Sequence, residues 1–344
     1  MGHSNSSLNC FANCMQKYNQ CYILNNKPAT TSPHLIFGTM AHEVLYNAGK
    51  LRDDTADGVI NPDDYYKVIP SEVLYPELKS AFNINSWDLY FKSVIKQVVQ
   101  YEKDCCKELS EYDKSSGLGD GSYEIERELK LQLTVEQLKQ LGEYNIEQPF
   151  VGIIDLLIHS KTSAIILDYK FSSSRKSQDD FDNNSQLPLY ALLVHILYDI
   201  PLQNIQYGYI DIPKQMFDMP ALLKNGTLSR SKAQNCSAEM YKAAVEAVHG
   251  NDAYYNCDKG GYYEEIYNSL MLNKAAYLSK QYLDFDIYEH IIKELFDTAR
   301  TIDMFKAKKL PFLRKFDSYS CKSCEYKETC KPWLSEVWQN EATV

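Results

Sequence analysis

Two short apolar runs in the middle of the chain have the length and composition of β-strands. Residues 152–159 read Gly-Ile-Ile-Asp-Leu-Leu-Ile-His, and residues 165–171 read Ile-Ile-Leu-Asp-Tyr-Lys-Phe. Both runs are largely apolar and rich in β-branched residues, and the polar segment Lys161-Thr162-Ser163 between them supplies a turn. The pattern therefore predicts a β-hairpin.

Each strand of this predicted hairpin carries charged residues, which are costly within apolar strands unless they have partners. Asp168 and Lys170 are two residues apart, so their side chains point to the same face, and the hairpin can bring Asp155 to the same end of the sheet. Two carboxylates can hold Mg²⁺ or Mn²⁺, and an ammonium beside them can orient a water. The pattern favours phosphodiester hydrolysis over a merely solvated hairpin.

Helical and strand-like patterns alternate along the rest of the chain. Helical spacing occurs over residues 6–25, 33–50, 87–115, 135–141 and 186–198. Strand-like alternation occurs over residues 123–133, where Glu124, Glu126 and Glu128 share one face, and over residues 205–212. A polar loop spans residues 172–185, and further helical patterns lie near residues 237–249, 262–282 and 285–308.

This order of elements predicts an α/β fold in one domain that spans residues 1–344. We divide it into an N-terminal helical part, a catalytic α/β core, a helical insertion and a C-terminal cysteine segment, over residues 1–120, 121–212, 213–310 and 311–344 respectively.

Composition and charge limit the kind of protein. Hydrophobic residues make up 44% of the chain and charged residues 24%, which is ordinary for a folded soluble protein. No apolar run approaches the roughly 20 residues that a membrane span needs, and the N-terminus has no apolar signal core, so we expect a cytoplasmic protein. The net charge of −10 argues against coating nucleic acid over the whole surface, but a local groove near Lys306–Lys315 is compatible with DNA binding.

Ten cysteines without a secretion signal point to metal binding or free thiols rather than to disulfides. Cys321, Cys324 and Cys330 form a Cys-x2-Cys-x5-Cys run, which suits zinc or an iron–sulfur cluster. A distant fourth cysteine, from a group near the start of the chain, would join the two termini. Only one Cys-x2-Cys pair is present and no histidine follows His290, which favours iron–sulfur over zinc.

Three further motifs complete a pattern along the chain: Cys14-Met-Gln-Lys-Tyr18, Gly38-Thr-Met-Ala-His42 and Gln186-Leu-Pro-Leu-Tyr190. Together with the hairpin and the cysteine run, they resemble the PD-(D/E)XK nuclease superfamily. Within it, the chain is most similar to the RecB-like branch with an iron–sulfur cluster, which includes CRISPR-adaptation exonucleases, AddB-type domains and phage RecB-like nucleases. Many members have proline after the first cysteine, where this chain has Met15, so Cys10 and Cys21 stay alternatives to Cys14.

The resemblance implies a restriction-endonuclease-like core, with a central mixed sheet flanked by helices. It implies that the metal is held by His42, Asp155, Asp168 and the backbone carbonyl of Tyr169. Lys170 would orient or activate water, while Gln186 and Tyr190 would brace the site and touch the DNA backbone. Glu126 would act through a water or be structural. A 4Fe–4S cluster that clamps the termini would be bound by Cys14, Cys321, Cys324 and Cys330.

We therefore expect a Mg²⁺- or Mn²⁺-dependent deoxyribonuclease, specifically an exonuclease on single-stranded or frayed DNA ends, in recombination, repair or phage DNA metabolism. No Gly-x4-Gly-Lys-Ser/Thr motif is present, so any unwinding would come from a helicase or recombination partner. The alternatives are a catalytically inactive iron–sulfur subunit for DNA binding or assembly, and a zinc-stapled structural protein.

Overall fold

A computed structural model provides the coordinates. The residues that it describes are 2–26, 33–54, 68, 87–172, 175–213, 220, 223–226, 228–229, 231, 234, 236–250, 263–271, 273–313, 321, 324–327 and 330. Within these ranges, no helix is both long and apolar enough to cross a membrane.

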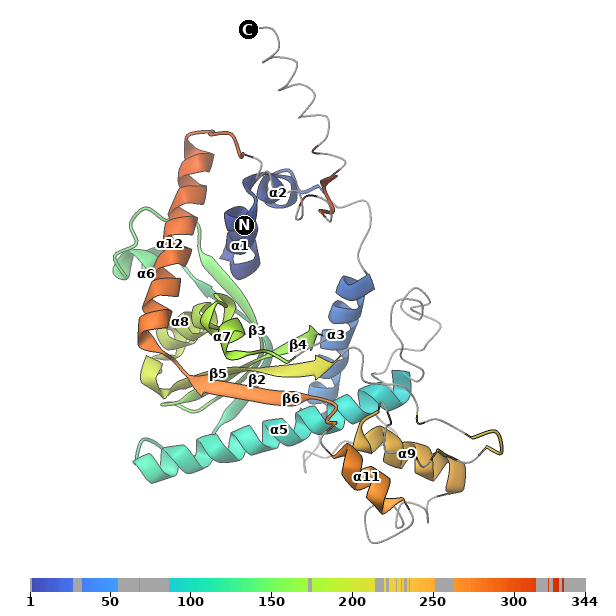
Figure 1. Cartoon of the computed structure of the whole chain (residues 1–344). Coiled ribbons are helices and arrows are strands. Elements are labelled where there is room, and N and C mark those ends of the chain that lie inside the picture. Colours follow the sequence, from blue (N-terminus) through green and yellow to red (C-terminus); the bar gives the residue numbers. More distant parts are fainter. Residues whose placement is uncertain are drawn as a thin grey trace.

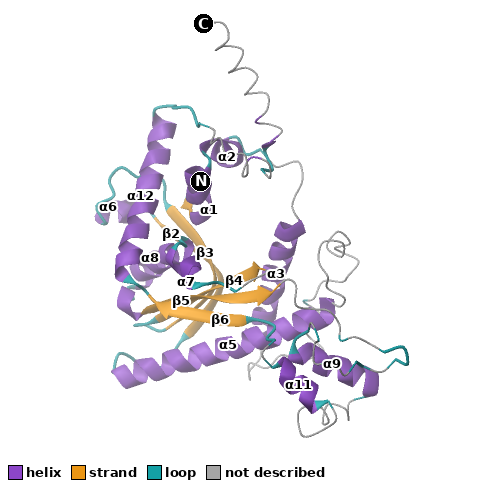
Figure 2. Ribbon diagram, in the orientation of Figure 1, coloured by secondary structure: helices purple, strands orange, loops and turns teal. Residues whose placement is uncertain are grey.

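A mixed β-sheet forms the centre of the structure (Figures 1 and 2). β2 (Glu124–Leu133) and β4 (Ala164–Ser172) both pair antiparallel with β3 (Phe150–His159). β5 (Ile205–Pro213) runs parallel to β4, and β6 (Tyr277–Tyr282) pairs antiparallel with β5. The β3–β4 hairpin and the central mixed sheet are confirmed.

Helices cover both faces of this sheet (Figure 1). α3 (Pro33–Asp53) and α5 (Trp87–Ser116) pack on one face, and α8 (Gln186–Tyr198) and α12 (Phe285–Ala307) on the other. Successive residues of β4 enter the two cores in turn, so Ile166 lies in the cluster with α8 while Leu167 lies in the cluster with α3 and α5. This alternation follows from the twofold period of a strand.

The connection from β4 to β5 carries the helix that supports the candidate site. Parallel strands need a crossover, and α8 supplies it between β4 and β5. α8 lies between the sheet and α12, which explains why it is apolar on nearly every side. The short α7 (Gln178–Asp182), capped by Ser177, forms within the predicted loop 172–185.

The N-terminal segment departs from the single helix predicted over residues 6–25. It begins with β1 (His3–Ser4), which the pattern did not indicate, and continues as α1 (Asn5–Asn13), α2 (Met15–Tyr18) and the π-helix η1 (Asn19–Ile23). Cys14 is extended, with φ −160° and ψ 106°. The break frees the N–H of Gln16, which donates to the Leu313 carbonyl at 3.1 Å. The break between α1 and α2 thus allows a hydrogen bond between the N-terminal segment and Leu313, which follows α12.

The region predicted as a helical insertion contains part of the core. The helix predicted over residues 262–282 is wrong, because only α11 (Glu264–Leu270) is helical and residues 277–282 form β6. Pairing with β5 decides this, since the sequence Tyr-Leu-Ser-Lys-Gln-Tyr alternates as an edge strand does. The helix predicted near residues 285–308 is confirmed as α12, but it packs in the core of the domain rather than in an added helical region. α9 (Ala238–His249), also confirmed, packs with α11 against the α5 side.

Two short elements complete the described structure. α6 (Val135–Gln140) confirms the helix predicted over residues 135–141, and a capping box between Thr134 and Gln137 fixes its start. The 3₁₀-helix η3 (Leu202–Asn204) leads into β5.

Candidate active site

The candidate site lies where β3 and β4 separate. The two strands pair from His159 opposite Ala164 to Leu156 opposite Leu167, and the pairing ends there. Further along the same strand, β1 pairs only with Phe150 and Val151 of β3. In the described part of the chain, residues 152–155 therefore have no strand partner on that edge. Asp155 stands at the point of separation.

The opposite edge of β3 is also irregular at this point. β2 and β3 pair at Arg127 opposite Leu156 and at Leu129 opposite Ile154, so Glu128 and Asp155 face each other between these pairs. Glu128 has a φ of 46°, which is uncommon for a residue with a side chain. Ile154 enters the core beneath α8, whereas Leu156 enters the core beneath α5. This break in the β2–β3 pairing lets the Asp155 side chain point to α3, while Ile154 and Leu156 on either side of it fill the cores on opposite faces of the sheet.

Both carboxylate oxygens of Asp155 have partners. Asp155 Oδ1 lies 3.2 Å from Nδ1 of His42, and Asp155 Oδ2 accepts a hydrogen bond from the backbone N–H of Tyr169 at 2.8 Å. Burial of His42 opposes its charged form, but the hydrogen bond and charge of Asp155 outweigh this and raise the pKa of His42. The structure therefore brings His42, Asp155 and Tyr169 together, as the motif order suggested.

Asp168 and Lys170 share the face of β4 that meets α8, as their spacing predicted. Lys170 Nζ lies 2.5 Å from Asp168 Oδ2 and donates to Oε1 of Gln186 at 2.8 Å. Gln186 Nε2 in turn donates to the Tyr190 hydroxyl at 2.8 Å. This chain of contacts brings the other predicted catalytic residues together on the α8 side of the sheet: Asp168, Lys170, Gln186 and Tyr190.

The charge of Asp168 is disfavoured in this setting. Its side chain is buried, and burial together with the negative charge of Asp155 raises the pKa of Asp168 to about 6, although Lys170 acts in the opposite direction. Two neighbouring carboxylates that repel each other, with an imidazole beside them, form a donor set that suits a divalent cation. The residue types thus fit the expected metal.

Among the described residues, no group of three histidine, cysteine, aspartate or glutamate side chains is placed to hold a metal. His42 Nδ1 and Asp155 Oδ1 are in contact with each other, so binding an ion would require them to exchange that contact for the metal.

Glu126 lies away from Asp155. Its Oε1 accepts a hydrogen bond from the Tyr198 hydroxyl at 2.6 Å and lies 3.1 Å from Nε2 of His159. The residue that faces the site is Glu128, because the irregularity in β2 turns it towards α3. Burial and the charge of Asp155 raise the pKa of Glu128. The alternating sequence predicted that Glu126 and Glu128 share one face of the strand. No pattern of side chains in the sequence indicates the break in pairing at Glu128 that separates them.

A small cavity lies beside Asp155. It is lined by His42, Tyr46, Arg127, Glu128, Asp155 and Tyr169. Arg127 and Tyr46 were not singled out from the sequence. The one sequence feature that could have identified Arg127 is that it is a charged residue within a predicted strand.

Two contacts join the segment around Cys324 to the N-terminal segment. Lys17 Nζ lies 3.0 Å from Oε1 of Glu325, and the Tyr326 hydroxyl donates to the Asn26 carbonyl at 3.0 Å. Burial, and a hydrogen bond with Cys21, raise the pKa of Tyr326. Glu325 and Tyr326, which lie between Cys324 and Cys330 in the sequence, thus contact the N-terminal segment that carries Cys10, Cys14 and Cys21.

No three of the described thiols are placed to hold an ion. Burial raises the pKa of Cys10 to about 11, with smaller effects from Cys21 and Cys14, so these thiols are near one another. Cys257 lies outside the described residues, as do Arg314 and Lys315 of the predicted basic segment.

The chain is an α/β protein whose polar site lies at the end of a separated strand pair. The model of the PD-(D/E)XK nuclease superfamily matches residues 3–331, and the chain belongs to this superfamily. Among solved structures, it is similar to the crystal structure of a protein from Eubacterium rectale that is described as a proposed exonuclease. The two are 8% identical with a TM-score of 0.40, over 93% of this chain and 92% of that chain. No curated protein matches the chain.

Proposed function

We propose that the chain is a Mg²⁺- or Mn²⁺-dependent deoxyribonuclease of the RecB-like branch, acting as an exonuclease on single-stranded or frayed DNA ends. The observation that carries this proposal is the position of Lys170, whose ammonium contacts Asp168 and Gln186. These residues lie near Asp155, in the notch that forms where β3 and β4 stop pairing. A buried carboxylate, a second carboxylate and an ammonium, gathered where β3 and β4 stop pairing, match the needs of phosphodiester hydrolysis.

Lys170 is the residue that would position the attacking water. An ammonium has three N–H donors; one donates to Gln186, and Asp168 holds the ammonium by charge. A remaining N–H can donate to the water oxygen and hold it for attack on phosphorus opposite the leaving group. The new P–O bond forms to the water oxygen as the P–O3′ bond breaks; the water gives up one proton to solvent and the leaving 3′-oxygen takes one from solvent, which leaves a 5′-phosphate and a 3′-hydroxyl.

The other site residues hold this arrangement in place. Asp155, Asp168, His42 and the Tyr169 carbonyl would hold the divalent ion, which when bound would polarise the phosphate and stabilise charge on the leaving oxygen. Gln186 keeps Lys170 in position and is itself held by Tyr190. At the start of α8, Gln186 and Tyr190 would also contact the DNA backbone.

The test is degradation of DNA labelled at either end, with Mg²⁺, with Mn²⁺ and with a chelator. Linear single strands should be shortened from an end only when metal is present, and a circular single strand of the same sequence should survive. Cleavage of the circle would show an endonuclease. A protein that binds DNA but degrades neither substrate would support the alternative of an inactive DNA-binding or assembly subunit.

We further propose that Cys321, Cys324 and Cys330 bind a 4Fe–4S cluster with Cys14. Its support is the packing of the C-terminal cysteine segment on the N-terminal helices, through Lys17–Glu325 and Tyr326–Asn26. Anaerobic purification should give a brown protein with about four iron and four sulfide per chain. Single Cys10→Ser, Cys14→Ser and Cys21→Ser variants identify the fourth ligand by loss of iron. A colourless protein that contains zinc would contradict the proposal.

A further inference from the structure

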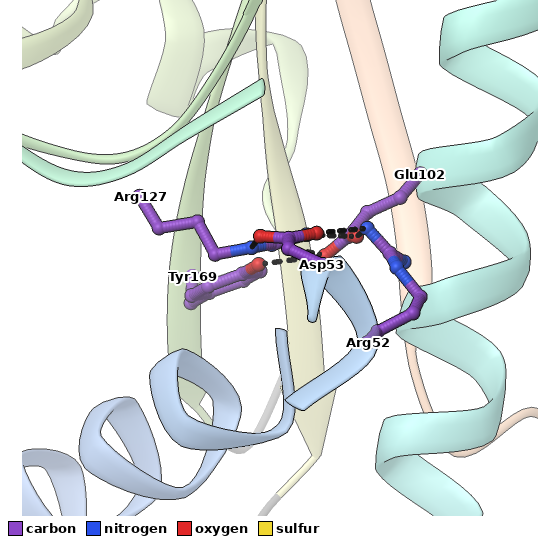
Figure 3. Close-up of polar contacts among 5 residues, drawn as sticks. All are labelled: Arg52, Asp53, Glu102, Arg127 and Tyr169. Atoms are coloured by element: carbon purple, nitrogen blue, oxygen red, sulfur yellow. Dashed lines mark hydrogen bonds and ion pairs between the residues drawn. The ribbon is translucent and has the colours of Figure 1, made fainter. Parts of the chain in front are cut away.

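Four charged side chains, three of them buried and one, Asp53, 37% exposed, meet where α3, α5 and β2 pack together (Figure 3). Arg52 and Asp53 come from the end of α3, Glu102 from α5 and Arg127 from β2. The side chains of Glu102 and Arg127 are each 3% exposed, and that of Arg52 is 6% exposed. We call these four residues the charge cluster.

The contacts within the charge cluster are specific. Arg127 donates from both terminal nitrogens to the two oxygens of Glu102, each at 2.9 Å, and Arg52 also pairs with Glu102. Arg127 Nε donates to Asp53 at 3.0 Å. A Cβ at Gly49 would overlap the Arg127 guanidinium, so the glycine lets Arg127 lie against α3. Two-point arginine–carboxylate pairing fixes direction as well as distance.

The charge cluster reaches the candidate site through Tyr169. The Tyr169 hydroxyl donates to Oε1 of Glu102 at 3.2 Å, as Figure 3 shows, and its side chain is buried. The backbone N–H of the same residue holds Oδ2 of Asp155. The side chain of Tyr169 is thus anchored beneath the sheet while its backbone supports a carboxylate of the site.

The charge cluster also fixes the helix that carries His42. Asp53 and Arg52 lie at the end of α3, and His42 lies three turns earlier on the same helix, in contact with Asp155. Holding the end of α3 against β2 and α5 therefore sets the distance between His42 and Asp155. Buried ion pairs are often no more stabilising than apolar side chains of similar volume, so stability alone does not account for the three buried charges of Arg52, Glu102 and Arg127.

We propose that Glu102 and the Tyr169 hydroxyl are positioning groups for the metal site of the proposed nuclease. Glu102, oriented by Arg127 and Arg52, holds Tyr169, and Tyr169 holds its own backbone and Asp155 in the geometry that binds the ion. This inference rests on the proposed function. Neither group touches DNA or the ion.

Tyr169→Phe is the sharpest test, because it removes one hydroxyl and keeps the ring in the core. The control is Tyr198→Phe, which removes a phenol–carboxylate hydrogen bond to Glu126 away from Asp155. Mn²⁺ binding is measured by calorimetry without DNA, and kcat and KM are measured on end-labelled DNA. Tyr169→Phe should raise the Kd for Mn²⁺ about tenfold and lower kcat with little change in KM, since partners of metal ligands have effects of this size. Tyr198→Phe should leave both unchanged.

A Glu102→Gln variant and the double variant separate positioning from general stability. If the two groups act through one hydrogen bond, the loss of Mn²⁺ affinity in Glu102→Gln should not increase further when Tyr169→Phe is added. Wild-type binding and cleavage by Tyr169→Phe, or additive losses in the double variant, would overturn the inference. A wild-type protein that neither binds Mn²⁺ nor degrades DNA would instead overturn the proposed function.

Discussion

The carboxylate of Asp155 accepts a hydrogen bond from the backbone N–H of Tyr169 at 2.8 Å, just where β3 and β4 stop pairing. The side chain supplies the acceptor that the neighbouring strand no longer offers. The separation of the strands therefore leaves no unpaired amide at this position, and the notch that holds the candidate site can form at little cost.

Substitutions of Asp155 should separate this structural role from metal binding. Asp155→Asn keeps an oxygen that can accept from Tyr169, so the free energy of unfolding should change little while Mn²⁺ binding is lost. Asp155→Ala leaves the amide without an acceptor and should cost about 1–3 kcal/mol. Urea unfolding and calorimetry measure the two effects. Equal destabilisation by both variants would show that the hydrogen bond is unimportant.

Replacing Lys170 with alanine should remove catalysis but not DNA binding. The ammonium is the donor that would hold the attacking water, so we expect kcat to fall by about 10²- to 10⁴-fold. DNA affinity, measured by fluorescence anisotropy, should stay near that of the wild type. Lys176→Ala is the control, because Lys176, just before α7, pairs with Asp180 of that helix at 3.2 Å and contacts none of the proposed site residues named above. Normal cleavage by Lys170→Ala would refute the mechanism.

The raised pKa of Asp168 predicts a characteristic dependence on pH. Its value of about 6 in the folded chain exceeds the roughly 3.9 of an unfolded aspartate. The folded state therefore holds an extra proton between these values, and Asp168 increasingly destabilises the metal-free protein as pH rises from 4 to 6. Asp168→Asn removes this titration, so its stability relative to the wild type should increase with pH by about 3 kcal/mol at most, at about 1.36 kcal/mol for each unit of pKa.

Metal binding should show the opposite trend with pH. The ionised carboxylate is the form that binds Mn²⁺, so affinity in the wild type should increase as pH rises through 6. Chemical unfolding of wild type and Asp168→Asn without metal, beside Mn²⁺ titrations of the wild type, measures both trends. A pH-independent stability difference and a flat Mn²⁺ affinity from pH 5 to 7 would show that Asp168 is ionised throughout.

Two glycines of the family motifs should respond differently to alanine. A Cβ at Gly152 would lie 2.7 Å from Cδ1 of Leu193 and 2.9 Å from Cε1 of Tyr190. Gly152→Ala should cost about 1–3 kcal/mol and lower kcat, because displacing Tyr190 disturbs Gln186 and Lys170. Gly38 lies within α3 with no atom within 4 Å of an added Cβ, so Gly38→Ala should stabilise the fold by about 0.5–1 kcal/mol. Thermal unfolding and kinetics test both, and unchanged kcat in Gly152→Ala would argue against this coupling.

Local pattern alone was sufficient for much of the fold and for one side of the candidate site. The twofold period of β4 places Asp168 and Lys170 on one face, and the apolar run after Ser185 predicts α8 with Gln186 at its start. Both depend only on residues close in sequence. Helical spacing likewise predicted α3, which carries His42.

Tertiary structure alone decided the features that depend on distant partners. Pairing with β5 made residues 277–282 a strand, and a contact with Leu313 accompanies the break at Cys14. The irregularity opposite Asp155 turns Glu128, not Glu126, towards the site, because a backbone change in two paired strands alters faces without altering the side-chain pattern. Glu102 could be assigned no role from sequence, since Arg127 and Tyr169 meet it only when β2, β4 and α5 pack together.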